Sequence, residues 1–511
     1  MGSTATDLAD WDDLVLKALE KWKVPGMSVA VVHEGESWAK AYGVAELPDK
    51  PLSTDSLFQG CSTTKAFTAA ATALVIDDES SNPSESQLKW DTPISSVIPD
   101  DFVLADPYAT ANTTFEDALS HRSGQPAHFM RLRFARTDES TQFAVRALRH
   151  MPLAYAPRTT FEYNNFMYIA VSHALEQRTR EALGSFMKRR IWEPLGMRDT
   201  YFDVREVEKT PGLKERLVQG YDWFEEVGNY KAQPNVNYGP TKGAGSMVST
   251  VLDYEKWVKA LLAKSTPLSK DAHEALFRPR SIVSSEQFAT SKPGAWAQLY
   301  ALGWFVDSYQ GIPFFWHTGG WPGTAILVGL VPSKNFGFVM MSNSSSASDM
   351  YKTLYTHLFK KYLNLPLSQD PDNSQTKPTE EKPQTSADAI QRFFKSLSLD
   401  EATPPSVPLS ALTGTYSHPA YGSMTITLED ETLRADCMDR VLGAIVDLEH
   451  VTVNHFLAKS YLPGWGKATV DYFAAEFHIA SSGRPDRLGI KLEPALEDMI
   501  WFDISSAVSA E

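Results

Sequence analysis

The sequence predicts an α+β fold, an antiparallel sheet with a helical subdomain, followed by a separate all-β barrel. Three features of the 511-residue chain favour this fold class. Strand-like segments at both ends of the first 365 residues enclose a long helical block, a polar stretch follows them, and short alternating segments fill the remainder. Strands on either side of a helical block bury their apolar faces when they share one sheet on which the helices pack.

The first elements are a helix and a hairpin. Residues 14–23 have the amphipathic spacing of a short helix. Two strand-like segments follow, from Pro25 to Val32 and from Ser37 to Gly43, and the turn residues His33-Glu34-Gly35 join them. We therefore expect an antiparallel hairpin at the start of the sheet.

Helical patterns dominate the chain from about residue 62 to residue 275, with turn clusters between them. Strand patterns then return near 302–306, 314–317, 325–331 and 336–342, and a helical pattern covers 351–362. The returning strands and the N-terminal hairpin are expected to form the single sheet.

The last part of the chain differs in composition. Residues 368–386 are rich in Gln, Asp, Pro, Thr, Lys, Glu and Ser and lack apolar periodicity, as linkers do. Beyond them, short alternating segments such as 424–428 and 469–473 are separated by turns, which is typical of a barrel or sandwich. The predicted units are a first domain of residues 1–365, a linker of 366–400 and a β domain of 401–511.

Composition excludes several classes of function. The formal charge of −15 argues against a nucleic-acid partner, because the basic surface that binds phosphates would stand out from this background. The first residues lack a signal peptide, and no apolar run reaches the roughly 18 residues that span a membrane. Cys61 and Cys437 fall in different predicted domains, which favours a reducing, cytoplasmic setting. We expect no membrane partner, no cofactor and no metal, and the oligomeric state stays open.

Ser62 and Lys65 lie where an extended segment passes into an apolar helix. Residues three apart on a helix are neighbours, so the Lys65 ammonium is expected beside the Ser62 hydroxyl. The free N–H groups and the dipole of the first helical turn favour negative charge there. These features are typical of an activated serine nucleophile, although an ordinary N-cap serine occupies the same position.

The Ser-x-x-Lys pattern decides little by itself, because it recurs in the chain. Its other occurrences lie in a Pro-rich stretch, an acidic loop, the predicted hairpin and a basic amphipathic helix, at Ser374, Ser86, Ser37 and Ser185. Among these serines, Ser62 is the one with a small-residue turn before it and a long apolar helix after it.

Two further segments complete a constellation with Ser62 and Lys65. Tyr163 and Asn165 follow the form Tyr-x-Asn, and residues 316–320 (Trp-His-Thr-Gly-Gly) lie at the end of a predicted strand. Each alone has a structural explanation, as a core tyrosine or a strand-end turn. Together, in order and spacing, they resemble the three motifs of serine β-lactamases of class C and their penicillin-binding and esterase relatives.

Flanking blocks extend this resemblance over residues 10–365. They are Ala118 to Gly124, Pro194 to Thr200, Gly243 to Thr250 and Leu302 to Trp304. Leu412 to Tyr416, with Pro419 to Gly422, resembles the lipocalin-like C-terminal domain of some members. The resemblance implies a β-lactamase/transpeptidase-like catalytic domain in 1–365 and a lipocalin-like barrel in 401–511.

In this constellation Ser62 attacks a carbonyl and forms an acyl-enzyme. A cationic Lys65 about 4 Å from Tyr163 is worth about 4 kcal/mol at an effective dielectric near 20, or about three pKa units. That effect favours a Tyr163 phenolate as the general base. Which of the two groups holds the proton at rest stays open, because the pair titrates as a unit.

The remaining candidates bind substrate. Asn165 orients Lys65 or a substrate amide, and the backbone N–H groups of Ser62 and Gly320 form an oxyanion hole. His317, Thr318 and Gly319 are expected beside the substrate. Aromatic residues in a polar segment either line a substrate pocket or pack a long loop; they are Tyr221, Trp223, Phe224, Tyr230 and Tyr238. Among them, we predict that Tyr238 binds substrate.

His317 departs from the β-lactamase pattern, in which a lysine usually stands at this position and is associated with the substrate carboxylate. The histidine form resembles esterases, D-amino-acid peptidases and acyltransferases of the same fold. We therefore expect a serine hydrolase or acyltransferase acting on a small-molecule ester, lactone, amide or thioester. The alternatives are a D-amino-acid-type peptidase of the same fold and a non-catalytic binding protein that retains it.

Overall fold

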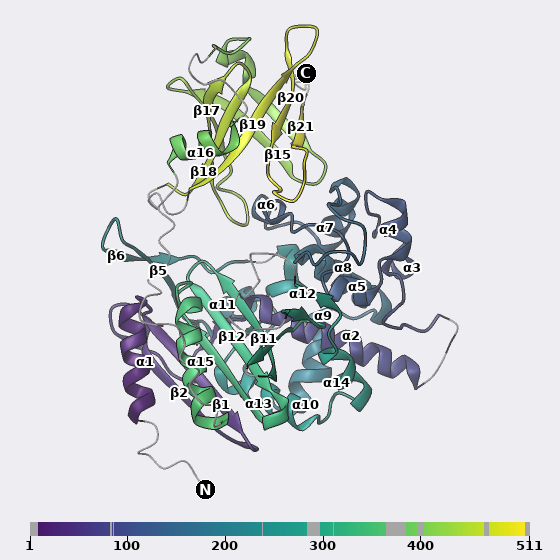
Figure 1. Cartoon of the computed structure of the whole chain (residues 1–511), viewed down its shortest axis with the longest axis vertical. Coiled ribbons are helices and arrows are strands. Elements are labelled where there is room, and N and C mark those ends of the chain that lie inside the picture. The colour runs from purple at the N-terminus through teal and green to yellow at the C-terminus, as the bar shows by residue number, and fades with distance from the viewer. Residues whose placement is uncertain are drawn as a thin grey trace.

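The computed structural model describes residues 9–81, 84, 86–237, 239–283, 297–309, 311–363, 385–395, 403–463 and 470–505. Figure 1 shows two bodies, a larger one of helices and sheet, and a barrel formed by the last part of the chain. The predicted fold class, an α+β domain followed by an all-β barrel, is confirmed. Within the described ranges, none of the helices combines the length and hydrophobicity that crossing a bilayer requires.

The large sheet joins the two ends of the first domain. Its antiparallel strands run in the order β3-β2-β1-β13-β12-β11-β10-β9-β8. In it, β1 (Gly26–His33) pairs with β2 (Glu36–Glu46) on one side and with β13 (Phe336–Ser342) on the other. The other strands are β3 (Lys50–Pro51), β8 (Ser281–Ile282), β9 (Leu299–Tyr300), β10 (Phe305–Tyr309), β11 (Ile312–Trp321) and β12 (Thr324–Val331).

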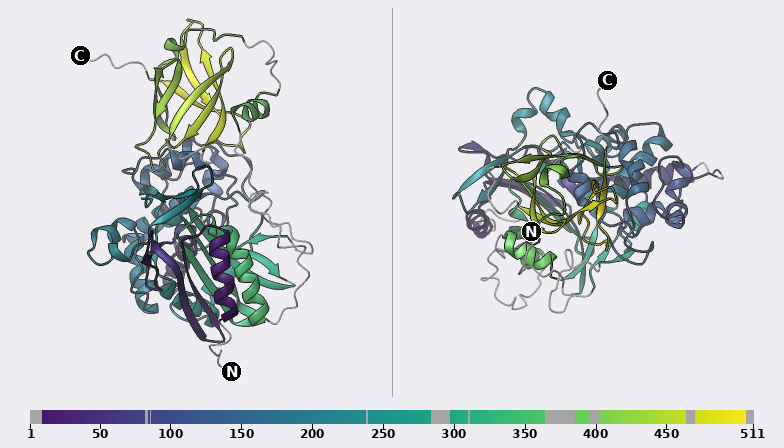
Figure 2. Two further views of the ribbon diagram at one scale, coloured as in Figure 1. Left: turned by 90° about the vertical axis from the view of Figure 1, so that its left-hand side faces the viewer. Right: turned by 90° about the horizontal axis from the view of Figure 1, so that it is seen from above.

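Helices cover both faces of this sheet, which explains why β12 is buried along its whole length. On one face α1 (Ala9–Lys21) and α15 (Ala347–Leu363) lie side by side, as Figure 2 shows. On the other face α13 (Val251–Ala263) packs against β13 so closely that a Cβ atom at Gly337 would lie 2.6 Å from Val258.

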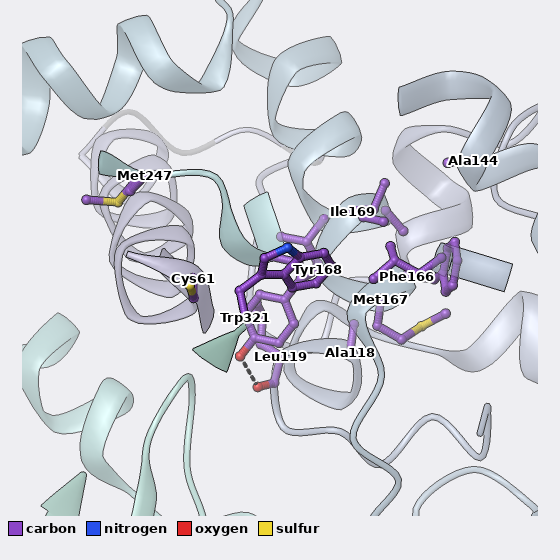
Figure 3. Close-up of a cluster of buried hydrophobic side chains, with 14 of the residues drawn as sticks. Cys61, Ala118, Leu119, Ala144, Phe166, Met167, Tyr168, Ile169, Met247 and Trp321 are labelled. Atoms are coloured by element: carbon purple, nitrogen blue, oxygen red, sulfur yellow. Dashed lines mark hydrogen bonds between the residues drawn. The ribbon is translucent and has the colours of Figure 1, made fainter. Parts of the chain in front are cut away.

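The helical subdomain surrounds α2 (Thr64–Ser80), whose residues from Thr64 to Val75 are all buried, and α8 (Asn165–Thr179). Figure 3 shows α8 side chains packed with residues of α5 (Phe115–Leu119) and α7 (Thr141–Ala147), where the Tyr168 hydroxyl donates to the Leu119 carbonyl at 2.6 Å. The other helices are α3 (Ile94–Val97), α4 (Pro107–Asn112), α5 (Phe115–Leu119), α6 (Phe129–Arg133), α7 (Thr141–Ala147), α9 (Leu183–Met187), α10 (Glu193–Leu195), α11 (Val204–Lys209), α12 (Lys242–Gly245) and α14 (Lys270–Phe277).

The structure also differs from the sequence prediction inside this domain. A hairpin of β5 (Gly220–Phe224) and β6 (Asn229–Gln233) interrupts the block that helical patterns dominate, and β4 (Phe58–Gln59) pairs with β7 (Val248–Ser249). The strand expected at 302–306 begins at Phe305, because Gly303 has a φ of 78° and turns the chain.

The C-terminal strands close into a barrel whose interior is filled by side chains. Tyr416, Phe456, Phe477 and Phe502 are fully buried there. Within the described part of the chain, the barrel strands are β14 (Gly414–His418), β15 (Gly422–Glu429), β16 (Thr432–Asp436), β17 (Ile445–Thr452), β18 (His455–Tyr461), β19 (Asp471–Ile479), β20 (Pro485–Ile490) and β21 (Ile500–Ile504).

A helix, α16 (Ser386–Phe393), lies within the range predicted as linker. Thr385 and Asp388 form a capping box at its start, and Ala389 is buried in a cluster with residues of β18 and β19. One short turn of apolar residues is too little to stand out from the polar composition around it.

The barrel is joined to the first domain next to α6. The N–H of Val441 donates to the Ala135 carbonyl at 2.8 Å, and the N–H of Leu442 donates to the Arg133 carbonyl at 3.2 Å. The N–H of His128 donates to the carboxyl of Glu493 at 2.6 Å. These bonds fix the barrel against the segment that precedes and follows α6.

Candidate active site

Ser62 lies in a single 3₁₀ turn (Cys61–Thr63) that leads directly into α2. Cys61 has a φ of 47°, in the left-handed region that side chains other than glycine rarely adopt. Thr63 holds this turn, because its hydroxyl donates to the Gly60 carbonyl at 2.6 Å and lies 2.6 Å from the Tyr254 hydroxyl. The strained turn presents the half-buried Ser62 to a cavity.

Lys65 is fully buried beneath Ser62. Its Nζ lies 3.3 Å from Ser62 Oγ, 2.7 Å from Asn165 Oδ1 and 2.9 Å from the Ala244 carbonyl oxygen. Burial holds the pKa of Lys65 well below its ordinary value, because the site is removed from the water that would stabilise the ammonium.

Tyr163 completes the group around Ser62. The Ser62 and Tyr163 side chains form a hydrogen bond, and Lys65 Nζ lies 4.8 Å from the centre of the Tyr163 ring. Burial raises the pKa of Tyr163 above its ordinary value, and the bond to Ser62 offsets this only in part. From the sequence alone, a cationic Lys65 is expected to lower that pKa. In the structure burial favours the uncharged form of both groups, so the balance runs in the opposite direction.

Asn165 is the first residue of α8, and its position depends on its neighbour Asn164. The Asn164 side chain caps the helix by accepting from the Met167 N–H at 3.0 Å. The backbone N–H of Asn164 donates to Nδ1 of His121 at 3.0 Å. The helix start is thereby held, and Asn165 faces Lys65.

The pairing of β11 with β10 ends at Trp316. The second half of β11 lies against the Ser62 turn. A Cβ atom at Gly319 would lie 2.6 Å from the Gly60 carbonyl oxygen and 3.2 Å from Ser62 N. A Cβ atom at Gly320 would meet nothing within 4 Å. The close contact between β11 and the Ser62 turn therefore requires glycine at position 319, whereas Gly320 faces open space.

His317 lies behind this surface with 1% of its area exposed. Its Nδ1 is 2.6 Å from the Thr318 carbonyl oxygen and its Nε2 is 3.0 Å from the Tyr300 hydroxyl. Burial, reinforced by Lys65, lowers the pKa of His317 to about 3. The ring is thus neutral, donating from Nδ1 and accepting at Nε2.

The site opens into a cavity of about 590 Å³. The candidate residues on its wall are Ser62, Tyr163, Asn165 and Gly320. The wall continues with Ala127, Phe129, Leu132, Arg133, Asp222, Phe224, Gln233, Thr241, Ala244, Gly245, Trp321, Pro322 and Ser345 of the first domain, and with Leu442, Gly443, Leu462 and Asp471 of the barrel. Tyr238 lies outside the described residues.

Several of these residues are not predicted from the sequence. Ala244, whose carbonyl binds Lys65, lies in the block from Gly243 to Thr250, which had been noted for its resemblance alone. Asp222 lies among the aromatic residues considered for the pocket; of these Phe224 lines the cavity, while the Tyr221 hydroxyl accepts from the Leu47 N–H at 3.0 Å. The barrel residues carry no local signal, because only the contact between the domains brings them to the site.

Comparisons with known proteins agree with this architecture. A family model described as Beta-lactamase matches residues 11–360, and one described as Domain of unknown function (DUF3471) matches residues 399–503. An unguisins hydrolase of Aspergillus campestris is 34% identical over 502 residues, covering 96% of this chain and 91% of the relative. An unguisins hydrolase of Aspergillus violaceofuscus is 33% identical, covering 98% and 91%.

Solved structures show the same fold. The octameric penicillin-binding protein homologue from Pyrococcus abyssi has a TM-score of 0.60 at 20% identity and covers 97% of this chain and 100% of its own. SurE has a TM-score of 0.56 at 17% identity and covers 96% and 98%. The chain therefore belongs to the β-lactamase family of hydrolases, and its C-terminal DUF3471 domain forms the antiparallel barrel.

Proposed function

We propose that this chain is a serine hydrolase that cleaves an ester or amide through an acyl-enzyme at Ser62. The observation that carries the proposal is the arrangement around one hydroxyl. Ser62 Oγ lies on the cavity wall, 3.3 Å from a buried amine and in a hydrogen bond with the half-buried phenol of Tyr163. A nucleophile, a base and an acid thus meet where a substrate carbonyl can enter.

The proposed first step uses Lys65 as a neutral base. A neutral amine has two N–H groups, which donate to Asn165 Oδ1 and the Ala244 carbonyl, and its lone pair is left facing the Ser62 hydroxyl. As Ser62 Oγ bonds to the carbonyl carbon, its proton passes to Lys65 Nζ.

The second step uses the protonated Tyr163. Its phenol gives a proton to the leaving alcohol or amine as the bond to the acyl carbon breaks, and Lys65 returns the first proton to the phenolate. Water then takes the place of the leaving group, and the same transfers in reverse release the acid and restore Ser62.

The developing oxyanion is assigned to the backbone N–H groups of Ser62 and Gly320. Support comes from the contact of Gly319 with the Ser62 turn, which brings the end of β11 beside Ser62. Each such donor is worth roughly 2.7 to 4 kcal/mol in the transition state.

The substrate is proposed to be uncharged at the group that lies near β11. His317 offers no cation there, since its ring is neutral, buried and bonded on both nitrogens. Carboxylate-bearing β-lactams are therefore expected to be poor substrates. Unguisins, named as the substrates of two relatives, are the first compounds to test.

The decisive experiment is a fluorophosphonate label followed by peptide mass mapping. We expect a single adduct on Ser62, and loss of both label and ester turnover in Ser62→Ala. Ser185→Ala is the matched control, because Ser185 has the same Ser-x-x-Lys pattern but is exposed on α9. Absence of any adduct, with a substrate still bound, would instead support a non-catalytic binding protein.

A second candidate, a peptidase for substrates with a free amine, is favoured by Asp222. This carboxyl lies on the cavity wall and accepts from the Gly323 N–H at 3.0 Å and from the N–H and hydroxyl of Ser345. A carboxylate can take a further donor, such as a substrate ammonium. Asp222→Asn should then slow free-amine substrates about tenfold or more relative to their N-acetyl forms. An equal effect on both would exclude the amine site.

A further inference from the structure

The barrel supplies part of the cavity wall above Ser62. Leu442 and Gly443 come from the loop between β16 and β17, and Leu462 follows β18. Phe129 and Leu132 of α6 belong to the same cavity. Two domains therefore contribute apolar residues to one space.

The loop that carries Leu442 has a fixed shape. Its base is closed by bonds between the backbone groups of Cys437 and Ala444, at 2.9 and 3.3 Å. A Cβ atom at Gly443 would lie 2.8 Å from the Met438 carbonyl oxygen, so the loop is tight at this point. This loop is preorganised before any substrate arrives.

The loop is also tied to the first domain at the C-terminal end of α6 and just beyond it. Backbone bonds run from Val441 and Leu442 to the carbonyls of Ala135 and Arg133. An ion pair of 2.9 Å joins Arg136 to Asp439. Leu442 is thus held against α6 by the same contacts that hold the domains together.

The two charged groups that α6 and the barrel contribute to this wall are paired with each other. Arg133, nearly buried, forms an ion pair with Asp471 of the barrel. Among the described residues, the junction offers a ligand the half-buried side chains of Leu442 and Leu462 and the exposed ring of Phe129, all of which are apolar. When a ligand covers apolar surface that faces a cavity, that surface is removed from water and the free energy of the system falls.

We propose that Leu442 and Leu462 of the barrel, with Phe129, form a subsite for a bulky apolar acyl group of the substrate. This rests on the proposed acyl-enzyme function and assigns the substrate class, a neutral acyl compound with a large hydrocarbon or aromatic part. The second domain then determines specificity, while the first performs the chemistry.

The test compares p-nitrophenyl octanoate with p-nitrophenyl acetate in Leu442→Ala, Leu462→Ala and the double variant. The ratio of kcat/KM for octanoate to that for acetate should fall about tenfold for each leucine. Met438→Ala is the matched control, because Met438 lies in the same loop, is 47% exposed and is not on the cavity wall. An unchanged ratio in the double variant would overturn the subsite.

A binding measurement separates this proposal from the proposed function. In a Ser62→Ala background, octanamide should change the fluorescence of Trp321, which lines the cavity, and the double leucine variant should weaken its binding about tenfold or more. If wild-type protein shows no Ser62 adduct while this binding difference persists, the function fails and the subsite stands. If Ser62→Ala and the Ser62→Ala protein that also carries both leucine substitutions bind octanamide with equal affinity, the subsite is refuted whatever the catalytic result.

Discussion

At the scale of single residues, the main effect is the burial of Lys65. An ammonium loses its hydration when the side chain is enclosed, and the three oxygens around Nζ belong to neutral groups. Hydrogen bonds to neutral oxygens compensate only part of that loss. Burial also raises the pKa of Tyr163, so the enclosed space favours the uncharged forms of both the amine and the phenol.

The first prediction concerns the pH dependence of catalysis. The pKa of Lys65 in the folded protein is lowered, so the active neutral amine is present above that pKa and is lost as the pH falls through it. kcat/KM for p-nitrophenyl acetate should therefore decline on the acidic side. Lys65→Arg, whose guanidinium keeps its proton, should lower kcat/KM about 10²- to 10⁴-fold at every pH.

The nearby imidazoles serve as the control for this assignment. Burial lowers the pKa of His317 to about 3 and that of His121 well below its ordinary value of 6.5, so neither ring produces an acidic limb at that ordinary value. Tyr300→Phe, which removes the hydroxyl bonded to His317, should leave the position of the acidic limb unchanged. A limb that moves in this variant, or one that Lys65→Arg retains, would contradict the role of Lys65.

The candidate residues themselves could be predicted because their signal is local. Ser62 and Lys65 are three positions apart, and Tyr163 and Asn165 are two apart, so short patterns bring each pair together. The protonation states could not, because they depend on enclosure by segments distant in the chain, such as the carbonyl of Ala244.

At the scale of elements, the contact between β11 and the Ser62 turn determines the position of Ser62, the proposed nucleophile. The strand approaches so closely that only hydrogen fits at Gly319, with the Gly60 carbonyl oxygen and the Cys61 Cβ as its neighbours. Gly60 caps the start of the turn, and Cys61 is its first residue and has a left-handed φ. A strand displaced from this turn would move Ser62 relative to β11.

The second prediction compares two adjacent glycines. Gly319→Ala places a Cβ atom 2.6 Å from a backbone oxygen, so the strand or the turn must shift. A displacement near 1 Å costs about 10²-fold in rate, and we expect at least this loss in kcat. The measurement is the burst and steady-state turnover of p-nitrophenyl acetate.

Gly320→Ala is the matched change at the next position, where a Cβ atom would meet nothing within 4 Å. Its thermal stability should equal that of the unmodified protein, while Gly319→Ala should unfold at a lower temperature. If both variants keep full stability and full activity, the contact between β11 and the turn does not position Ser62.

The larger elements followed from periodicity, and the smaller ones did not. The hairpin of β1 and β2 and the buried strands β12 and β13 have long apolar or alternating patterns that need no tertiary information. The strands β5 and β6 have five residues each, too short for their periodicity to be distinguished from that of an aromatic loop, and α16 depends on its contact with the barrel.

At the scale of the whole molecule, the two domains meet at a pair of acids. Glu162, next to Tyr163 in sequence, belongs to the first domain, and Glu493 belongs to the barrel. Glu493 accepts from the N–H of His128 at 2.6 Å and from that of Ala495 at 3.1 Å. Burial, with repulsion from Glu493, raises the pKa of Glu162 to about 7, and burial also raises that of Glu493.

This pair makes the stability of the assembled domains depend on pH. A carboxyl with a raised pKa keeps its proton in the folded protein between the ordinary value of 4.5 and about 7, whereas the unfolded chain loses it. The unfolded state then binds fewer protons, so the free energy of unfolding falls as the pH rises through this window. The effect ends above about pH 7, where both states have lost the proton.

The third prediction follows from that sign. Glu162→Gln removes the titrating group but keeps a side chain of similar shape, so the variant should be more stable than the unmodified protein at pH 8 and equal to it near pH 4. We expect the free energy of unfolding to rise by about 1 kcal/mol at pH 8. This is well under the free energy that corresponds to the full pKa shift of Glu162, because that side chain is partly exposed. Thermal unfolding between pH 4 and pH 8 measures it.

Two further variants decide whether the effect belongs to the domain contact. Glu36→Gln, at the exposed start of β2, controls for the loss of one negative charge from an acidic protein and should show no such pH dependence. Glu493→Gln should stabilise with the same sign if it keeps the bond to His128, and the double variant should gain less than the sum, because each acid raises the free energy of the other. Strict additivity would show that the two carboxyls do not interact, and that the pKa of Glu162 reflects burial within the first domain alone.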